Sequence, residues 1–257
     1  MITSASNQKM KNLMSLCQKS KERRAQQSFI VEGPKMFLEA PENWIKEVYV
    51  SESFWAKCSY KDQLKKKGCE IVADDVFKRV ADTRTPQGIM SVLTCPHYEL
   101  DELLASDNPL LVILEDLQDP GNLGTILRAA EGAGVNGVIM TKDTVDIFNP
   151  KVIRATMGSV YRIPFYQTDD LKNTIQVLKN KGIWVYAAHL QDSVCYDEAD
   201  YRKGTAFLIG NEGNGLKKET ADAATQYIKI PMLGQVESLN AAMATSILMY
   251  EAARQRR

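Results

Sequence analysis

The stretch from residue 207 to the C-terminus constrains the fold most, because it contains two strand-to-loop junctions followed by a helix. Residues 207–209 form a continuous apolar run, typical of a strand buried on both faces of a parallel sheet, and three glycines follow by residue 215. Tyr227, Ile228 and Ile230 predict a second strand, which ends at Pro231, because proline cannot donate to a strand ladder. Ligands of open α/β sheets bind beyond the carboxyl ends of strands. The two junctions therefore predict a small-molecule site.

A final helix is expected over residues 238–254, with Ser238 as its N-cap. The side chains that recur at helical spacing and are predicted to face the core are Leu239, Ala242, Met243, Ile247 and Tyr250. The helix also carries Leu248 and Met249, so it offers more apolar surface than one core face requires.

Upstream, apolar strands and helical segments alternate, which predicts an α/β fold with a mainly parallel sheet and helices on both faces. Strands are expected at residues 110–114, 137–140, 163–165 and 183–188, and helices at 123–134, 151–157 and 170–181. The first part of the chain predicts a smaller α/β/α layer with strands at 29–31, 47–50, 69–72 and 88–93. We therefore expect a domain over residues 1–95, a linker over 96–109 and a second domain over 110–257.

Charge is unevenly distributed in this chain, although its formal net charge is zero. Residues 1–95 carry an excess of about five positive charges, and the remainder carries the matching negative excess. The bias is strongest before residue 25, where only Glu22 opposes a basic group made of Lys9, Lys11, Lys19, Lys21, Arg23 and Arg24. This segment is a candidate RNA-phosphate contact. The alternative is an ordinary solvated helix face.

The five cysteines form no CxxC pair and no cluster with the two histidines, so neither a metal site nor a disulfide framework is expected. The N-terminus lacks the apolar core of a signal peptide, and no run approaches the length of a membrane span. These features predict a cytoplasmic protein with no membrane partner.

Residues 119–128 place an acidic-proline-glycine loop between a strand and a helix. Asn122 is predicted as the N-cap of this helix, and Arg128 lies inside it among apolar residues. An arginine in a cleft needs an anionic partner. The alternative interpretation is a helix cap and an ordinary salt-bridged arginine.

Three motifs occur in order: Asn122-x-Gly124-x-x-x-Arg128, then Gly210-Asn211-Glu212-Gly213-x-Gly215-Leu216, then Ile230-Pro231-Met232-x5-Glu237-Ser238-Leu239-Asn240. Together they closely resemble the three motifs of the SpoU-type (TrmH-like) RNA ribose 2′-O-methyltransferases of the SPOUT superfamily, over roughly residues 110–257. The N-terminal part is similar to the substrate-binding domain of the family, which has an L30e/L7Ae-like fold.

The resemblance implies a C-terminal trefoil-knot domain that binds S-adenosylmethionine. The residues expected to contact this cofactor are Ala187, His189, Gly210, Ile230, Met232, Leu233, Ser238 and Leu239, with Ala188 beside them.

The residues expected to act in catalysis are Asn122, Arg128, Glu212, Ser238 and Asn240. Free arginine is a very poor base. We therefore expect Arg128 to bind the adjoining phosphate and lower the pKa of the ribose hydroxyl, with a phosphate oxygen or Glu212 as proton acceptor. Glu212 has an alternative role, which is to orient a neighbouring Asn or Arg.

The resemblance also implies a homodimer through the C-terminal domain and favours large-subunit ribosomal RNA (23S rRNA) as substrate. The rivals are a tRNA ribose methyltransferase, an enzyme that modifies a base, and a non-catalytic RNA-binding or ribosome-assembly factor on the same scaffold. The sequence leaves open the nucleoside, the choice between free rRNA and an assembled particle, a link to antibiotic resistance, and the general base.

Overall fold

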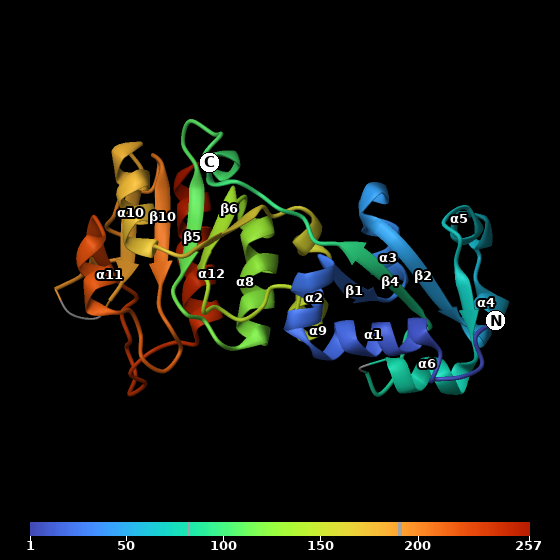
Figure 1. The fold of residues 1–257 in the computed structure, drawn as a ribbon. Helices are drawn as coiled ribbons and strands as arrows, with labels where there is room; N and C mark the ends of the chain where they lie inside the picture. Colours follow the sequence, from blue (N-terminus) through green and yellow to red (C-terminus); the bar gives the residue numbers. More distant parts are fainter. Residues whose placement is uncertain (82, 190–191) are drawn as a thin grey trace. The chain divides into compact units, whose positions relative to one another are not determined.

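The computed structural model describes residues 1–81, 83–189 and 192–257, which form two compact units (Figure 1). Unit 1 consists of Met1–Pro96 and Asp146–Tyr161, and unit 2 consists of His97–Val145 and Arg162–Arg257. From the sequence, residues 146–161 were predicted to belong to the second domain, over residues 110–257. In the structure, this segment belongs to unit 1.

Unit 1 contains a four-stranded sheet in the order β1-β4-β2-β3. Its strands are β1 (Ser28–Glu32), β2 (Ile45–Ser51), β3 (Glu70–Val72) and β4 (Ile89–Thr94). Strand β4 is antiparallel to both β1 and β2, and β2 is parallel to β3. The helices of unit 1 are α1 (Gln8–Gln18), α2 (Ser20–Gln26), α3 (Pro34–Glu39), α4 (Glu52–Lys57), α5 (Lys61–Lys66), α6 (Asp74–Val80) and α9 (Pro150–Thr156), with 3-10 turns η1 (Glu42–Trp44) and η2 (Ser159–Tyr161).

A buried ion pair attaches the 146–161 segment to unit 1. Arg23 is only 3% exposed, and its Nε lies 2.9 Å from Oδ2 of Asp146. Its Nη1 donates to the carbonyl oxygen of Leu16 at 2.7 Å. A buried charge is tolerated only when it is paired in this way. Arg23 is therefore a structural residue. The prediction that it contacts RNA is wrong, because it has almost no exposed surface.

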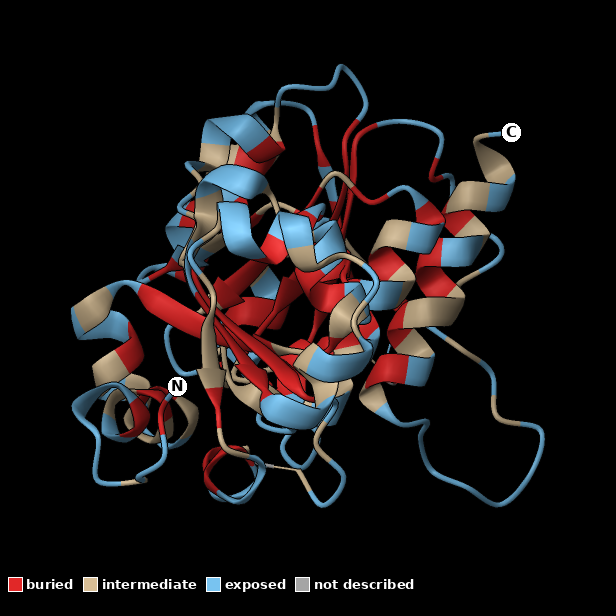
Figure 2. Cartoon of the chain, turned by 90° about the vertical axis from the view of Figure 1, so that its right-hand side faces the viewer, coloured by how far each residue is buried: buried red, intermediate tan, exposed pale blue. Residues whose placement is uncertain are grey.

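Unit 2 contains a seven-stranded sheet in the order β7-β6-β5-β10-β8-β11-β9, and every strand pair is parallel. The strands are β5 (Leu110–Leu114), β6 (Gly137–Thr141), β7 (Phe165–Thr168), β8 (Trp184–Ala188), β9 (Val194–Cys195), β10 (Thr205–Ile209) and β11 (Gln226–Lys229). The helices are α7 (Leu100–Leu103), α8 (Pro120–Ala133), α10 (Leu171–Asn180), α11 (Lys218–Ala223) and α12 (Ala241–Gln255). The parallel α/β fold predicted from the apolar runs is confirmed. The central strands β5, β6 and β10 are buried over almost their whole length, and Figure 2 shows buried residues concentrated in the strands of the molecule.

The strand order places a topological switch between β5 and β10. The chain runs from β5 outward through β6 and β7, then crosses to β8, and β10 returns between β5 and β8. Ligands of open α/β sheets bind where the strand order reverses, beyond the carboxyl ends. The loops that follow Leu114 and Ile209 meet at this point.

Helix α12 packs against α8, β5 and β10, with a different face from the one predicted (Figure 1). Its buried residues are Ala242, Thr245, Leu248, Met249 and Ala252. In contrast, Met243 is 57% exposed and Tyr250 is 48% exposed, so the predicted core face was wrong except at Ala242. The buried face combines small side chains with Leu248 and Met249, whereas Met243 and Tyr250 lie on the opposite, exposed side. Of the described residues, none belongs to a helix long and apolar enough to cross a membrane.

Candidate active site

The loop after β10 is a tight turn that has no room for side chains at its start. A Cβ on Gly210 would lie 2.2 Å from the carbonyl carbon of Gly215 and 2.4 Å from the nitrogen of Leu216. Gly215 itself has a positive φ of +67°, which favours glycine. Asn211 and Gly215 exchange two backbone hydrogen bonds, at 3.1 and 2.9 Å. The glycines therefore fix a rigid backbone loop at the carboxyl end of β10.

Two acidic residues after β5 hold this loop in place. Glu115 is buried, and its carboxylate accepts hydrogen bonds from the backbone nitrogen of Lys217 at 2.8 Å and from the hydroxyl of Thr220 at 2.6 Å. The Lys217 ammonium lies 2.7 Å from Asp116. Burial alone would raise the pKa of Asp116, but hydrogen bonds from Lys217 and Thr141 lower it below its usual value. The loops after β5 and β10 are thus tied together by charged hydrogen bonds.

A chain of three polar side chains connects the three sequence motifs. Oε1 of Glu212 accepts a hydrogen bond from Nδ2 of Asn122 at 3.0 Å. Oδ1 of Asn122 accepts one from Nδ2 of Asn240 at 2.9 Å. Oδ1 of Asn240 then accepts from the backbone nitrogens of Ala242 and Met243, which makes Asn240 the N-cap of α12 in place of the predicted Ser238.

Glu212 also accepts two backbone hydrogen bonds from the loop that begins α8. The nitrogen of Gln118 donates at 3.0 Å and that of Asp119 at 2.9 Å. Burial alone would raise the pKa of Glu212, but these bonds and the one from Asn122 lower it below the usual value. Asp119 is the N-cap of α8, because it accepts from the backbone nitrogen of Asn122 at 2.8 Å. Asn122 therefore lies in the first turn of α8 and is not its N-cap, so that prediction was wrong. Its side chain instead forms hydrogen bonds with Glu212 and Asn240.

A cavity of about 640 Å³ opens beside this network at the carboxyl ends of the strands. Its walls come from the end of β8, the glycine loop after β10, the end of β11, the loop before α12 and the first turns of α12. The lining residues are Ala188, His189, Ile209, Gly210, Asn211, Glu212, Gly213, Asn214, Gly215, Leu216, Ile228, Lys229, Ile230, Met232, Glu237, Ser238, Leu239, Asn240, Ala241, Ala244 and Leu248.

The loop over residues 231–239 forms one side of the cavity and is mostly exposed. Across the described chain, no backbone group of this loop makes a hydrogen bond with another residue. Backbone donors and acceptors that have no protein partner are suited to a polar ligand.

Most of the residues expected to bind the cofactor line this cavity, namely His189, Gly210, Ile230, Met232, Ser238 and Leu239. Two do not. Ala187 is fully buried in the core on the α10 side of the sheet, and Leu233 is fully exposed. Among the residues expected in catalysis, Glu212, Ser238 and Asn240 line the cavity. Asn122 is not part of the lining, but its side chain forms hydrogen bonds with Glu212 and Asn240.

Arg128 is exposed on α8 and is absent from the cavity lining. It follows Asn122 by six residues, so it lies about 9 Å further along the helix axis and about 120° away around it. Its guanidinium forms no hydrogen bond or ion pair with any residue that the structure describes. The hydrogen-bonded chain of Glu212, Asn122 and Asn240 therefore does not include Arg128.

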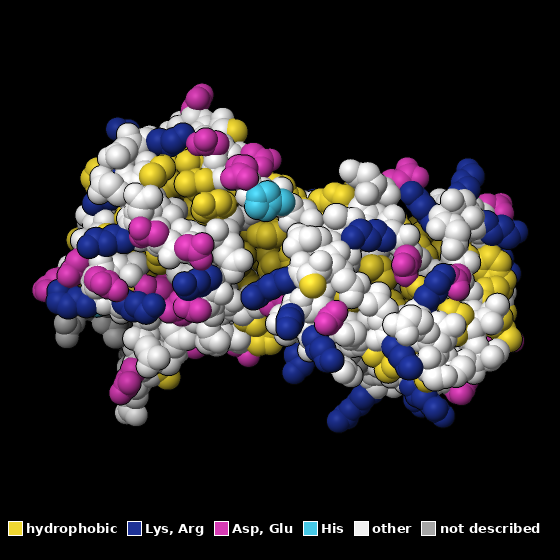
Figure 3. Space-filling model, viewed as in Figure 1, with side chains coloured by type: hydrophobic (Ala, Val, Ile, Leu, Met, Phe, Trp, Pro, Cys, Tyr) yellow, Lys and Arg dark blue, Asp and Glu magenta, His cyan; other side chains and the backbone are white. Residues whose placement is uncertain are grey.

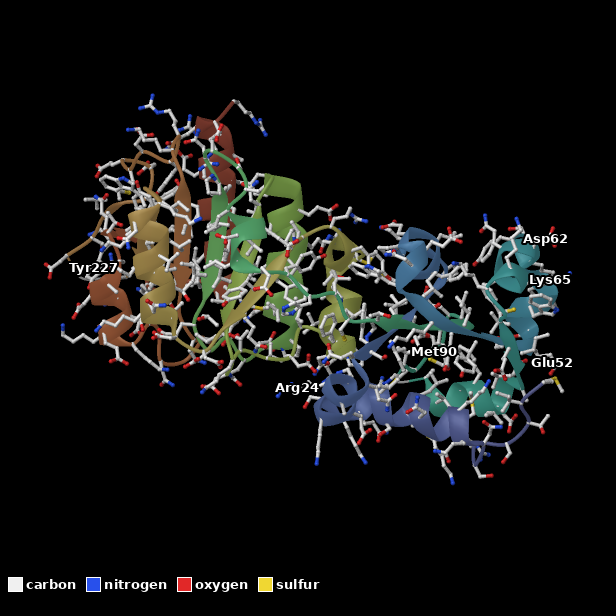
Figure 4. The ribbon with its side chains drawn as sticks, turned by 45° about the horizontal axis from the view of Figure 1, so that its top comes forward. Arg24, Glu52, Asp62, Lys65, Met90 and Tyr227 are labelled. Atoms are coloured by element: carbon white, nitrogen blue, oxygen red, sulfur yellow. The ribbon has the colours of Figure 1, made fainter. Side chains whose placement is uncertain are left out.

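The remaining basic residues of the predicted RNA-contacting group lie on the surface of unit 1. Lys11, Lys19, Lys21 and Arg24 are exposed, and Lys9 pairs with Glu70. Figure 3 shows Lys and Arg side chains gathered over α1 and α2, and Figure 4 labels Arg24 on α2.

Sequence reasoning assigned no role to three residues that support the site, Glu115, Asp116 and Asn211, although Asn211 is part of the second motif. Asn211 donates to the carbonyl oxygen of Asp116 at 2.8 Å and accepts from the nitrogens of Gly213 and Asn214. The sequence did contain a signal for Glu115, which directly follows a fully apolar strand. A carboxylate buried at such a position must accept hydrogen bonds, and this predicts polar partners nearby.

Together, the parallel sheet, the cavity at its carboxyl edge and the linked polar residues define an α/β enzyme with a small-molecule site. The sequence model of the SpoU rRNA Methylase family matches residues 109–250, and the chain belongs to this family. A second model, the MRM3-like substrate binding domain, matches residues 7–91. In the described residues, no cluster of side chains is arranged to hold a metal ion.

Similar proteins cover between 73% and 98% of the chain. The 23S rRNA (guanosine(2553)-2′-O)-methyltransferase RlmP of Bacillus subtilis is 35% identical over 97% of this chain and 97% of its own length. The 23S rRNA (guanosine-2′-O-)-methyltransferase RlmB of Shewanella oneidensis is 34% identical over 73% of this chain and 78% of its own. The AdoMet-bound rRNA methyltransferase from Sinorhizobium meliloti superimposes with a TM-score of 0.88 at 32% identity, covering 98% of this chain and 97% of that one.

Proposed function

We propose that this protein transfers a methyl group from S-adenosylmethionine to a ribose 2′-hydroxyl in 23S rRNA. The observation that carries the proposal is the hydrogen-bonded chain of Glu212, Asn122 and Asn240, which brings the three family motifs together at one cavity. The full-length similarity to a 23S rRNA 2′-O-methyltransferase supports the reaction and the substrate.

The cavity suits S-adenosylmethionine in size and chemistry. Its volume of about 640 Å³ lies within the usual range of small-molecule sites, about 300–1,000 Å³. Gly210 and Ile230 would hold the cofactor mainly through their backbones, with Leu239 and Met232 giving apolar contact and Ser238 a hydroxyl. When bound, the cofactor supplies an electrophilic methyl group on a sulfonium. The trefoil knot that the family resemblance implies remains a prediction.

Glu212 serves this site as an orienting acceptor and not as the general base. Three N–H donors already occupy its oxygens, and its lowered pKa makes it a weaker base than an ordinary glutamate. The hydroxyl proton then passes to another acceptor, for which a phosphate oxygen of the RNA is the candidate. Arg128 binds that phosphate and lowers the pKa of the hydroxyl by its charge.

We further propose that the protein is a homodimer that associates through its C-terminal unit. Large apolar side chains stand exposed in and beside α12: Leu233 at 100%, Val236 at 62%, Leu239 at 36%, Met243 at 57% and Tyr250 at 48%. A surface of this kind is typical of a protein interface. Since α8 packs on α12, Arg128 lies on a helix next to this surface. We propose that it acts in the site of the second copy.

Mixed dimers test this arrangement. Subunits carrying Arg128→Ala keep the cavity, and subunits carrying Gly210→Val keep the arginine, so each homodimer should be inactive. If Arg128 acts across the interface, mixing and reannealing the two should restore up to about a quarter of wild-type activity, because half of the dimers are mixed and each has one complete site. Inactive mixed dimers would show that Arg128 serves its own subunit.

The basic face of α1 and α2 is proposed to contact the RNA backbone, and guanosine is the proposed target nucleoside because the RlmP and RlmB relatives are named for it. An enzyme that acts on ribosomal RNA would work in the cytoplasm.

The deciding experiment is methyl transfer from labelled S-adenosylmethionine to unmodified total rRNA and tRNA, with Arg128→Ala as a control. Nuclease digestion should place the label in 2′-O-methylguanosine of 23S rRNA for the wild type only. Cofactor binding without labelling of either RNA would point to an assembled particle as substrate. Absence of cofactor binding would contradict the proposed reaction and favour an RNA-binding assembly factor.

A further inference from the structure

A second set of contacts begins at the wall of the cavity that follows strand β8. His189, which lines the cavity, donates its backbone nitrogen to the carbonyl oxygen of Ile228 at 3.0 Å. Its ring faces the ring of Tyr227, with the two centroids 4.8 Å apart and the planes 39° from parallel. Such a distance and tilt are within the range of attractive aromatic pairs.

Tyr227 is itself anchored at its far end. Its hydroxyl donates to Oδ1 of Asp222 in α11 at 2.8 Å, and Nζ of Lys218 lies 2.7 Å from the other oxygen of the same carboxylate. Tyr227 packs partly against the core beneath α10 and α11, and Figure 4 labels it beside α11. Its ring is therefore held at both its apolar body and its polar tip.

We propose that Tyr227 is a positioning residue for the methyl-donor site, which fixes the His189 ring as a flat wall of the cavity. A histidine side chain at the end of a strand can turn about two torsions, and each turn opens or closes the space beside it. Contact with an anchored ring restricts that freedom before the cofactor arrives, so less ordering is left to occur on binding. This inference rests on the proposed use of the cavity for S-adenosylmethionine.

The ring contact can be measured without any cofactor. The chain has only two histidines, and His97 lies in another part of unit 2 beside Glu99. In protein labelled with ¹³C at histidine, the ring current of Tyr227 should displace the His189 ring-proton resonance, and Tyr227→Leu should remove that displacement. The His97 resonance should stay unchanged in both proteins. A His189 resonance that does not respond to Tyr227→Leu would overturn the proposal.

A double-mutant cycle on cofactor affinity then tests the function of the contact. By titration calorimetry, we expect His189→Ala to raise the dissociation constant of S-adenosylmethionine about tenfold, and Tyr227→Leu to raise it about fivefold. In the His189→Ala background, Tyr227→Leu should change affinity less than about twofold, because its effect passes through the ring that His189→Ala removes. His189→Phe should regain most of the affinity lost in His189→Ala.

Additive effects in the cycle would show that Tyr227 acts only on the general stability of unit 2, and would overturn the proposal. If Tyr227→Leu does not fold, Tyr227→Phe tests the hydroxyl anchor alone, because it keeps the ring and removes the hydrogen bond to Asp222. We expect it to raise the dissociation constant about twofold in the wild-type background and to leave it unchanged in the His189→Ala background. If the wild-type protein does not bind S-adenosylmethionine, the proposed function fails, while the resonance measurement still decides whether the ring contact exists.

Discussion

Replacing Asn122 with aspartate should turn the central hydrogen bond of the site into a repulsion that depends on pH. In the native protein Nδ2 of Asn122 donates to Oε1 of Glu212 at 3.0 Å. Asn122→Asp puts a second carboxylate at this distance while keeping an acceptor for Asn240. Two unit charges 3.0 Å apart repel by about 1.4 kcal/mol in water and by about 5.5 kcal/mol at an effective dielectric constant of 20. Because Glu212 is partly exposed, we expect about 2 kcal/mol after relaxation.

The sign of the pH effect follows from which group can take up a proton. The pKa of Glu212 is lowered in the native protein, so its carboxylate is charged at neutral and mildly acidic pH, and its stabilising contribution is lost only as pH falls through that lowered pKa. In the variant, two adjacent carboxylates raise the pKa of one of them. As the pH falls, that group takes up a proton and becomes a donor, which restores a hydrogen bond between the two side chains.

Thermal unfolding at about pH 8 and at about pH 5 provides the assay. Relative to wild type, Asn122→Asp should lower the melting temperature by about 4–8 °C at the higher pH, since 1 kcal/mol corresponds to about 2–4 °C for a protein of this size. The deficit should fall by more than half at the lower pH. Asn122→Ala places no titratable group at this position, so its loss in melting temperature relative to wild type should be the same at the two pH values. Equal deficits for Asn122→Asp at the two pH values would refute the assigned contact with Glu212.

Three further outcomes are expected. Gly210→Ala should abolish S-adenosylmethionine binding in calorimetry, because its Cβ would lie 2.2 Å from backbone, whereas Gly213→Ala, with its nearest contact at 3.6 Å, should bind normally. Neutralising Lys21 and Arg24 should reduce the slope of log K against log salt for rRNA by about 0.7–0.9 for each RNA phosphate that the protein no longer neutralises, and an unchanged slope would place the RNA-binding surface elsewhere. Met243→Glu should give monomers in sedimentation, and a persistent dimer would exclude this face of α12 as the interface.

The apolar runs were sufficient to predict the parallel sheet, because a strand buried on both faces must be apolar throughout. They did not predict which face of α12 is buried. Leu239, Met243 and Tyr250 follow helical spacing as well as the small residues do, and only the close approach of α8 and the sheet selects the side with Ala242 and Ala252. Periodicity identifies the residues that share one face of a helix. Which face is buried also depends on the side chains that the neighbouring helix and sheet can accommodate.

The caps of the two helices show a similar limit. Asn122 and Ser238 are good N-cap residues by type, but Asp119 and Asn240 occupy the cap positions. Asn122 instead bonds to Glu212 and Asn240, which lie 90 and 118 positions away in the sequence, and Asn240 makes its bond to Asn122 in addition to capping α12. Such contacts have no local pattern, so only the family resemblance could place these residues together before the structure was known.

The arrangement of Glu212, Asn122 and Asn240 also connects two surfaces that the sequence motifs treat separately. Glu212 belongs to the loop that lines the cavity, Asn122 lies in the first turn of α8, and Asn240 caps α12. Helices α8 and α12 pack together and carry the arginine and the exposed apolar side chains of the proposed dimer surface. Each link is a direct hydrogen bond of 2.9–3.0 Å, so we expect a change in the position of Glu212 to displace the start of both helices. On this basis, occupation of the cavity and association of two copies should be coupled, and cofactor binding should strengthen the dimer by the same factor by which dimerisation strengthens cofactor binding.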